Sequence, residues 1–336
     1  MYMEYAKFGN TGIEVSRLSL GCMDFPVRLE ESEAKAVLDH AIDQGVNLLD
    51  TADTYGAGRA EEVLGRILKG KRDRVILATK FWAKMYDRPN GGGCSRVHIL
   101  NAVEDSLRRL QTDWIDLYQL HHPDSATSAE ETISTLDNLV RQGKIRYYGV
   151  SNHYAWQMAH MLGVSALHNW EPLVSVQCRY NIMDRVIENE IVPFAERFNI
   201  AVLTYGGLNG GILSGHYRSK DDKPIEGSRV ARLKNYQAKL TDDAYDLLSR
   251  LDDMASKYGI GVNQLAIAWL ISKRHVTTVL MGGSKPEHFT PIYDVFDLQI
   301  SEEDLAQIDV WSERWRYMPF HNQRNTTGAG PALNWW

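Results

Sequence analysis

Short apolar runs alternate with helix-like segments along most of this chain. Eight runs have strand-like length and composition, at residues 18–20, 46–49, 75–78, 115–120, 145–150, 174–177, 200–204 and 277–280. Between them, residues 33–42, 99–110 and 129–140 carry apolar side chains at helical spacing. Gly45, Gly143 and Gly259 stand where such helices are expected to end. Strands that alternate with helices form parallel sheets, and eight of them in 336 residues predict a (β/α)8 TIM barrel.

A doubly wound α/β sheet is the alternative architecture for this pattern. Its dinucleotide-binding form carries G-x-G-x-x-G directly after the first strand. The nearest match here, Gly56-Ala-Gly58-Arg-Ala-Glu61, follows the second run and ends in Glu. The sequence therefore favours the barrel, with residues 1–336 as a single domain.

Three segments lie outside the repeat. Residues 4–8 and 13–16 flank Asn10-Thr11-Gly12, which predicts an N-terminal β-hairpin that closes the bottom of the barrel. Residues 208–236 form a long polar loop after the seventh run, and we expect such long loops at the C-terminal face. The tail, at about 312–336, is expected to pack over the barrel or over the mouth of the active site.

Composition narrows the class of protein. Lys and Arg (37) against Asp and Glu (43) give a net charge of −6 without a basic block, so a nucleic-acid partner is not expected. Cys22, Cys94 and Cys178 lie far apart without C-x-x-C spacing, which favours a reducing compartment and predicts a cytoplasmic location. The first ten residues lack a secretory apolar stretch, and the apolar run at 265–271 is too short to span a membrane.

Four residues that suit proton transfer follow successive runs. Asp50 and Tyr55 follow the second run, Lys80 the third and His121 the fourth. Taken singly, each of these residues is typical of a helix cap, a packed ring or a solvated charge. The C-terminal ends of the strands of a barrel meet at one rim, however, so these four side chains are expected to lie together. A phenol has a pKa near ~10, and a nearby ammonium lowers that pKa. We therefore expect Tyr55 to donate a proton to a carbonyl oxygen that His121 orients. Asp50 is expected to hold Lys80 charged beside the phenol.

At these residues the sequence closely resembles the aldo-keto reductase family. The resemblance runs from Lys7-Phe-Gly-Asn-Thr-Gly-Ile-Glu-Val-Ser16 to about Trp311, and it includes the segment Asp50-Thr-Ala-Asp-Thr-Tyr55-Gly. It implies a (β/α)8 barrel without a metal, and a nicotinamide cofactor bound without a Rossmann fold. The implied activity is reversible reduction of an aldehyde or ketone to the alcohol, with Asp50, Tyr55, Lys80 and His121 as the catalytic tetrad.

The resemblance also implies the cofactor contacts. Ser151, Asn152 and Gln177 would hydrogen-bond the nicotinamide carboxamide, and Tyr205 would stack on its ring. The family's usual Tyr-Ser-Pro-Leu is Tyr205-Gly-Gly-Leu208 here, so the conformation of that loop stays open. The remaining expected contacts, at the pyrophosphate and the adenosine phosphate or beside the tetrad, are Gly21, Cys22, Met23, Asp50, Gly206, Leu208, Gly210, Gly282, Ser284, Lys285 and His288. Lys285 and Ser284 favour NADP(H), with NAD(H) as the alternative. Cys22 has a second reading, as a redox thiol, although packing is commoner for such a residue.

The loops at the mouth of the expected active site indicate which residues contact the substrate. Asp24, Phe25, Trp82 and His122 are expected to line it, with Trp82 equally suited to packing under a lid. Polar Asp24 and His122 beside aromatic rings suit a hydroxylated, sugar-like carbonyl. The Gly-rich stretch 87–94 suits a flap. The expected partner is a small carbonyl or alcohol, and monomer and homo-oligomer both stay open.

Two rival functions remain. A barrel lysine such as Lys80 supports Schiff-base lyase chemistry, although that reading gives Tyr55 and Gln177 no joint role. Family barrels also serve as channel-associated subunits that retain cofactor, and an intact tetrad does not separate that role from catalysis.

Overall fold

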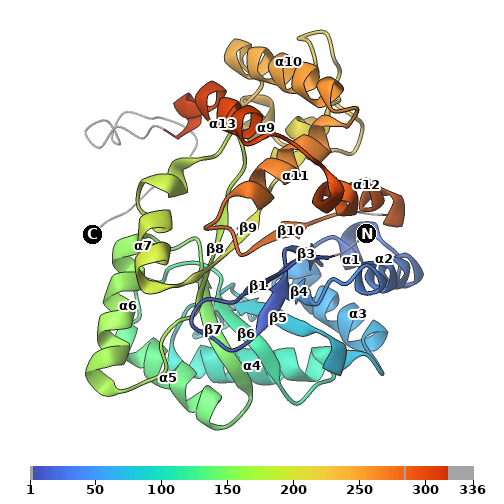
Figure 1. Ribbon diagram of the computed structural model, residues 1–336. Coiled ribbons are helices and arrows are strands. Elements are labelled where there is room, and N and C mark those ends of the chain that lie inside the picture. Colours follow the sequence, from blue (N-terminus) through green and yellow to red (C-terminus); the bar gives the residue numbers. More distant parts are fainter. Residues whose placement is uncertain (1–2, 284, 317–336) are drawn as a thin grey trace.

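The computed structural model describes residues 3–283 and 285–316 of the chain. Within these residues, eight parallel strands close into a barrel in the order β10-β3-β4-β5-β6-β7-β8-β9 (Figure 1). The strands are β3 (Leu18–Gly21), β4 (Leu48–Asp50), β5 (Ile76–Phe81), β6 (Ile115–Leu120), β7 (Ile145–Ser151), β8 (Ser175–Arg179), β9 (Ala201–Tyr205) and β10 (Thr278–Met281). The predicted TIM barrel is confirmed.

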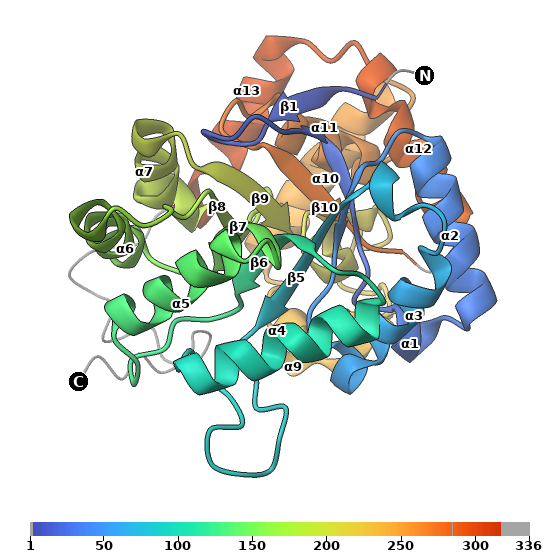
Figure 2. The ribbon, with the colours of Figure 1, turned by 90° about the horizontal axis from the view of Figure 1, so that it is seen from below.

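Helices surround the barrel and cover its outer face (Figures 1 and 2). The outer helices are α2 (Glu31–Asp43), α3 (Arg59–Ile67), α4 (Arg96–Leu110), α5 (Ala129–Arg141), α6 (Ala155–His168), α7 (Ile191–Phe198) and α11 (Val262–Ser272). Ser95 and Ser128 cap α4 and α5 by accepting hydrogen bonds from the backbone N–H groups of His98 and Glu131. Gly143 follows α5 with a φ of 72°, as expected for a glycine at a helix end.

Shorter elements fill the loops and the C-terminal part. The short helices are α1 (Phe25–Arg28), α8 (Arg229–Arg232), α9 (Lys234–Gln237) and α12 (Thr290–Tyr293), and two longer ones are α10 (Asp242–Lys257) and α13 (Glu302–Trp311). The 3-10 turns are η1 (Tyr55–Gly58), η2 (Arg72–Arg74), η3 (Val186–Asn189), η4 (Asn209–Ser214), η5 (Pro286–His288), η6 (Asp294–Asp297) and η7 (Glu313–Trp315). Thus η4, α8 and α9 occupy the long loop predicted after the seventh strand.

The predicted hairpin closes the bottom of the barrel. Strand β1 (Tyr5–Lys7) pairs antiparallel with β2 (Glu14–Ser16). Phe8 and Val15 are fully buried against apolar side chains of the strands, among them Leu48 and Leu203. Burial of these side chains stabilises the plug by removing apolar surface from water.

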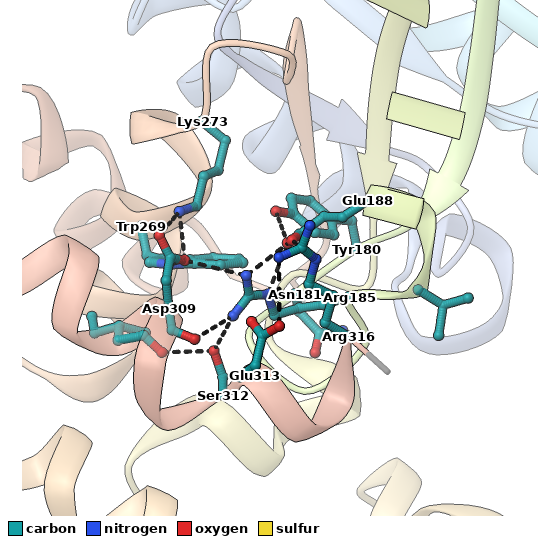
Figure 3. Close-up of polar contacts among 12 residues, drawn as sticks. Tyr180, Asn181, Arg185, Glu188, Trp269, Lys273, Asp309, Ser312, Glu313 and Arg316 are labelled. Carbon is teal, nitrogen blue, oxygen red and sulfur yellow. Dashed lines mark hydrogen bonds and ion pairs between the residues drawn. The ribbon is translucent and has the colours of Figure 1, made fainter. Parts of the chain in front are cut away.

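A buried polar cluster ties the C-terminal elements to the loop after β8 (Figure 3). The Arg185 side chain donates to both Glu188 carboxylate oxygens (2.8 and 2.9 Å), to the Asp309 carbonyl (2.7 Å) and to Ser312 Oγ (2.8 Å). In addition, its backbone N–H donates to the carbonyl of Trp315 (3.1 Å). Residues 312–316 therefore lie against η3. The rest of the predicted tail, 317–336, lies outside the described residues.

None of the helices formed by residues 3–283 and 285–316 combines the length and the apolar character that crossing a bilayer requires.

Candidate active site

Lys80 lies at the centre of the predicted tetrad, at the C-terminal ends of β4 and β5. Its Nζ donates to Asp50 Oδ2 (2.5 Å) and to the carbonyl oxygen of Thr51 (2.8 Å). It also donates to Tyr55 Oη, at 3.2 Å. The side chain is fully buried. Three of the four expected residues are thus joined by direct hydrogen bonds.

These contacts decide the charge of Lys80. Burial by itself would lower the pKa of the ammonium, but the neighbouring Asp50 carboxylate and Tyr55 phenol outweigh burial and hold that pKa above its usual value. A lysine that attacks a carbonyl to form a Schiff base must first be neutral. The environment of Lys80 therefore disfavours the lyase reading.

The Tyr55 phenol differs from the sequence-based expectation in one respect. Burial raises its pKa, Lys80 lowers it and Asp50 raises it again, so that the net pKa lies above the usual value. The ammonium alone would lower the pKa of the phenol, and the exclusion of solvent by the fold reverses that direction. The group is consequently a protonated phenol, which suits a proton donor. Arg229, at the start of α8, also lowers this pKa, and the sequence reading did not single it out.

His121 faces the phenol edge-on. The two ring centroids lie 5.8 Å apart at 82°. Burial, with help from Lys80 and His122, lowers the pKa of His121 to about 3, so its imidazole is neutral at ordinary pH. A neutral imidazole can hydrogen-bond a substrate oxygen without acting as the acid. This arrangement matches the orienting role expected of it.

An aromatic wall extends from the tetrad toward the mouth. The rings of His121 and His122 are stacked at 5.0 Å, and Trp82 packs on His122 at 4.8 Å. Trp82 has a φ of 129°, a conformation that costs of order 1–3 kcal/mol for a bulky residue. Asp24 is partly buried, and its Oδ1 lies 3.9 Å from Nε of Arg28.

Phe25 does not line the mouth. Its side chain is 1% exposed and belongs to the main hydrophobic core, because the first turn of α1 directs it inward. The expectation for Phe25 was therefore wrong.

The side chains expected to read the nicotinamide carboxamide form a connected group. Asn152, with a φ of 61°, donates from Nδ2 to Ser151 Oγ (3.1 Å) and accepts at Oδ1 from Tyr205 Oη (2.8 Å). Gln177 donates from Nε2 to Asp50 Oδ1 (2.8 Å). These polar groups meet beside the tetrad and fit an amide-bearing ring.

Gln119 was missed by the sequence reading. It is fully buried, and its Nε2 donates to Asp50 Oδ1 at 3.0 Å, so two amides and one ammonium share that carboxylate. The available signal was its position on β6, two residues before His121. Residues two apart on a strand share a face.

The loop after β9 provides only part of the expected backbone approach. Gly206 has a φ of 71° and Gly210 a φ of 68°, conformations that favour glycine. The space that a Cβ of Gly210 would occupy holds the Tyr236 ring, so this glycine accommodates a side chain rather than an open cleft. Leu208 is partly buried.

Gly21 is the last residue of β3, and Cys22 and Met23 follow it. Cys22 is fully buried, and burial raises the pKa of its thiol, which disfavours the redox reading. Its backbone N–H donates to the Asp50 carbonyl (2.8 Å), whereas Met23 is 38% exposed.

The segment after β10 is more open. Apart from Gly282 itself and its chain neighbours, none of the residues at 3–283 and 285–316 places an atom within 4 Å of the position that a Cβ of Gly282 would take, so a phosphate can approach this backbone. Lys285 and His288 are exposed, and Lys285 precedes η5, which spans three residues. Ser284 lies outside the described residues.

A second buried charge cluster explains the weak glycine motif. Glu61, its last residue, is fully buried and accepts hydrogen bonds from Thr79 Oγ1 (2.6 Å) and Arg109 Nε (2.7 Å). Nearby, burial and the Glu61 charge raise the pKa of Asp53 to about 8. The motif is thus part of the packing behind η1 rather than a phosphate loop.

Comparisons with known proteins agree with this geometry. A model of the Aldo/keto reductase family matches residues 17–313. The sequence is 34% identical to an aldo-keto reductase, YhdN, of Bacillus subtilis, in an alignment that covers 91% of this chain and 93% of the relative. It is 32% identical to an L-glyceraldehyde 3-phosphate reductase of Escherichia coli O157:H7, over 91% and 92% of the two chains. It is also 34% identical to a probable voltage-gated potassium channel subunit beta of Oryza sativa, over 84% and 88%.

Proposed function

The chain belongs to the aldo/keto reductase family and is an oxidoreductase, and from this we propose that it reduces an aldehyde or ketone to the alcohol with NADPH. In this proposal Tyr55 is the general acid in reduction and the general base in alcohol oxidation. The observation that carries it is Lys80 Nζ, shared between Asp50 Oδ2 and Tyr55 Oη.

The proton chemistry follows from these contacts. When bound, the reduced nicotinamide supplies a hydride to the carbonyl carbon. Neutral His121 orients the carbonyl oxygen by a hydrogen bond, and Tyr55 gives its proton to that oxygen as negative charge develops there. Lys80 stabilises the phenolate that remains, and Asp50, Gln119 and Gln177 hold Lys80 in place through the shared carboxylate.

We assign the cofactor contacts to the groups expected from the sequence. Ser151, Asn152 and Gln177 would hold the carboxamide, and Tyr205 would stack on the ring. Lys285 would contact the 2′-phosphate of NADPH by a charge-assisted hydrogen bond. The polar, partly buried Asp24 and His122 support a hydroxylated, sugar-like carbonyl as substrate. The cysteines are free thiols, which supports a cytoplasmic location.

Tyr55→Phe tests the proposal. We expect kcat for aldehyde reduction to fall by about 10²–10⁴, because general-acid catalysis is lost. The Kd for NADPH, measured by fluorescence titration, should stay within about twofold, because Tyr55 Oη is not among the proposed cofactor contacts. Tyr86→Phe is the matched control, since this phenol donates to Asp105 on α4, outside the tetrad. A Tyr55→Phe protein that keeps more than a tenth of wild-type kcat would contradict the role of Tyr55.

A second candidate is a cofactor-retaining subunit without turnover. The relative named as a probable voltage-gated potassium channel subunit beta favours it. NADPH oxidation by the wild-type protein with sugars, α-dicarbonyls and aromatic aldehydes decides between the two. Tight NADPH binding without steady-state oxidation of any of these would support the subunit.

A further inference from the structure

Asp124, three residues after His121, holds the base of the loop between β5 and α4. This loop is the long teal segment at the lower edge of Figure 2. Asp124 Oδ2 accepts hydrogen bonds from the backbone N–H of Cys94 (2.7 Å) and from Thr127 Oγ1 (2.9 Å). Its Oδ1 accepts from the backbone N–H of Ala126 (2.9 Å). The carboxylate thus joins the segment after β6 to the far end of the loop.

Gly93 links Asp124 to Trp82. Its N–H donates to the carbonyl oxygen of Trp82 at 2.8 Å, which closes the loop at its base. Gly93 has a φ of 86°, and a Cβ at this position would lie 2.9 Å from Asp124 Oδ2. The Asp124 carboxylate therefore packs directly against the residue that holds the Trp82 carbonyl.

Trp82 needs such support. A tryptophan at a φ of 129° is in a conformation that persists only where its surroundings enforce it. The ring packs on His122, which stacks on His121 of the tetrad. A change in the Trp82 backbone would move this ring relative to the position where a substrate carbonyl must lie.

We propose that Asp124 is a positioning residue that fixes the strained conformation of Trp82, and that it thereby favours carbonyl substrates with a flat face that lies against the Trp82 ring. The proposal rests on the proposed reductase function. Asp124 acts through Gly93 and Cys94 and touches neither substrate nor cofactor.

The rest of the loop has its own anchor. Tyr86 Oη donates to Asp105 on α4, and the Tyr86 ring lies edge-on to buried His98 at 6.3 Å. Loss of the Asp124 contact should therefore loosen the base of the loop without detaching it. The expected effect is local, on the position of Trp82.

The kinetic test compares two aldehydes of different shape. In Asp124→Ala, kcat/KM for benzaldehyde should fall by about tenfold or more, mainly through KM, while propanal should change by less than about twofold. Asp124→Asn keeps one acceptor oxygen and should give an intermediate loss for benzaldehyde. Thr127→Val is the matched control, because it removes a hydrogen bond to the same carboxylate without touching the loop. In a Trp82→Ala background, Asp124→Ala should have no further effect on benzaldehyde.

A second readout is independent of turnover. Amide hydrogen exchange at Cys94 and Gly93 should accelerate in Asp124→Ala and stay unchanged in Thr127→Val, while strands β5 and β6 remain protected. Equal losses for both aldehydes, or an undiminished loss in the Trp82→Ala background, would overturn the proposal, as would unchanged exchange at Cys94. A wild-type protein that reduces no carbonyl would overturn the proposed function and the selectivity with it, whereas exchange at Cys94 reports on the loop contact by itself.

Discussion

Lys80 Nζ lies between a carboxylate and a phenol in a solvent-free position, so single charges dominate the chemistry of this site. Burial favours the neutral form of both Lys80 and Tyr55. At Lys80, the Asp50 carboxylate and the Tyr55 phenol oppose it. At Tyr55, Lys80 and Arg229 oppose it, whereas the Asp50 charge acts in the same direction as burial. The sequence could place these residues together because Asp50 and Lys80 lie at the C-terminal ends of β4 and β5, and Tyr55 lies in η1, shortly after β4. The net direction of the Tyr55 pKa was not predictable, because it depends on how completely the fold excludes water.

Lys80→Met should move the pH dependence of alcohol oxidation upward. Removing the ammonium takes away the contact that lowers the pKa of Tyr55, and it leaves the Asp50 charge, which raises that pKa. Oxidation needs the phenolate, so the rising limb of its pH–rate profile should shift to higher pH. A folded variant with an unchanged profile would remove Lys80 from the mechanism.

Among the elements, the strands were predicted to within two residues at most ends, because buried parallel strands read as short continuous apolar runs. The irregular connections were harder. The inward turn of Phe25 and the positive φ of Trp82 depend on contacts with distant segments that no local pattern carries. Gly210 is an expected phosphate contact, and the Tyr236 ring, 26 residues away in the chain, fills the space that its Cβ would occupy.

Lys285→Ala tests the segment after β10. The exposed Lys285 precedes η5, which has three residues, so its own charge must supply most of the attraction for a 2′-phosphate. We expect the Kd for NADPH to rise about tenfold and the Kd for NADH to change little. Lys69→Ala, an exposed lysine at the opposite face of the barrel, is the control. Equal effects on the two cofactors, or wild-type binding that does not prefer NADPH, would indicate an NAD-using or dual enzyme.

At the scale of the whole molecule, the Arg185 cluster joins three parts of the chain that are distant in sequence. The guanidinium is 4% exposed and connects Glu188 after β8 with Asp309 and Ser312 near the end of the described chain (Figure 3). Asp309 in turn accepts hydrogen bonds from Nε1 of Trp269 on α11 (2.9 Å) and from Nζ of Lys273, which directly follows α11 (2.6 Å). This cluster was not predicted, because its members share no spacing pattern.

Arg185→Met should lower the free energy of unfolding by about 3 kcal/mol or more, because Glu188 and the Asp309 carbonyl lose a buried partner. Urea titration followed by circular dichroism measures this. Arg314→Met, which removes an exposed ion pair with Asp243, should change stability far less. Equal stability losses in the two variants would show that the buried cluster contributes no more than a surface pair.

Closure of the barrel has a consequence for how the protein is made. Strand β3 near the N-terminus pairs with β10, and Ser19 Oγ contacts Thr278 Oγ1 across 259 residues of sequence. While the ribosome is still translating, β3 lacks one neighbour, so the nascent chain presents an open sheet edge through most of synthesis. The final joining of first and last strands must await release of the C-terminal segment from the exit tunnel. We therefore expect truncation before β10 to yield chains that associate with each other or with chaperones.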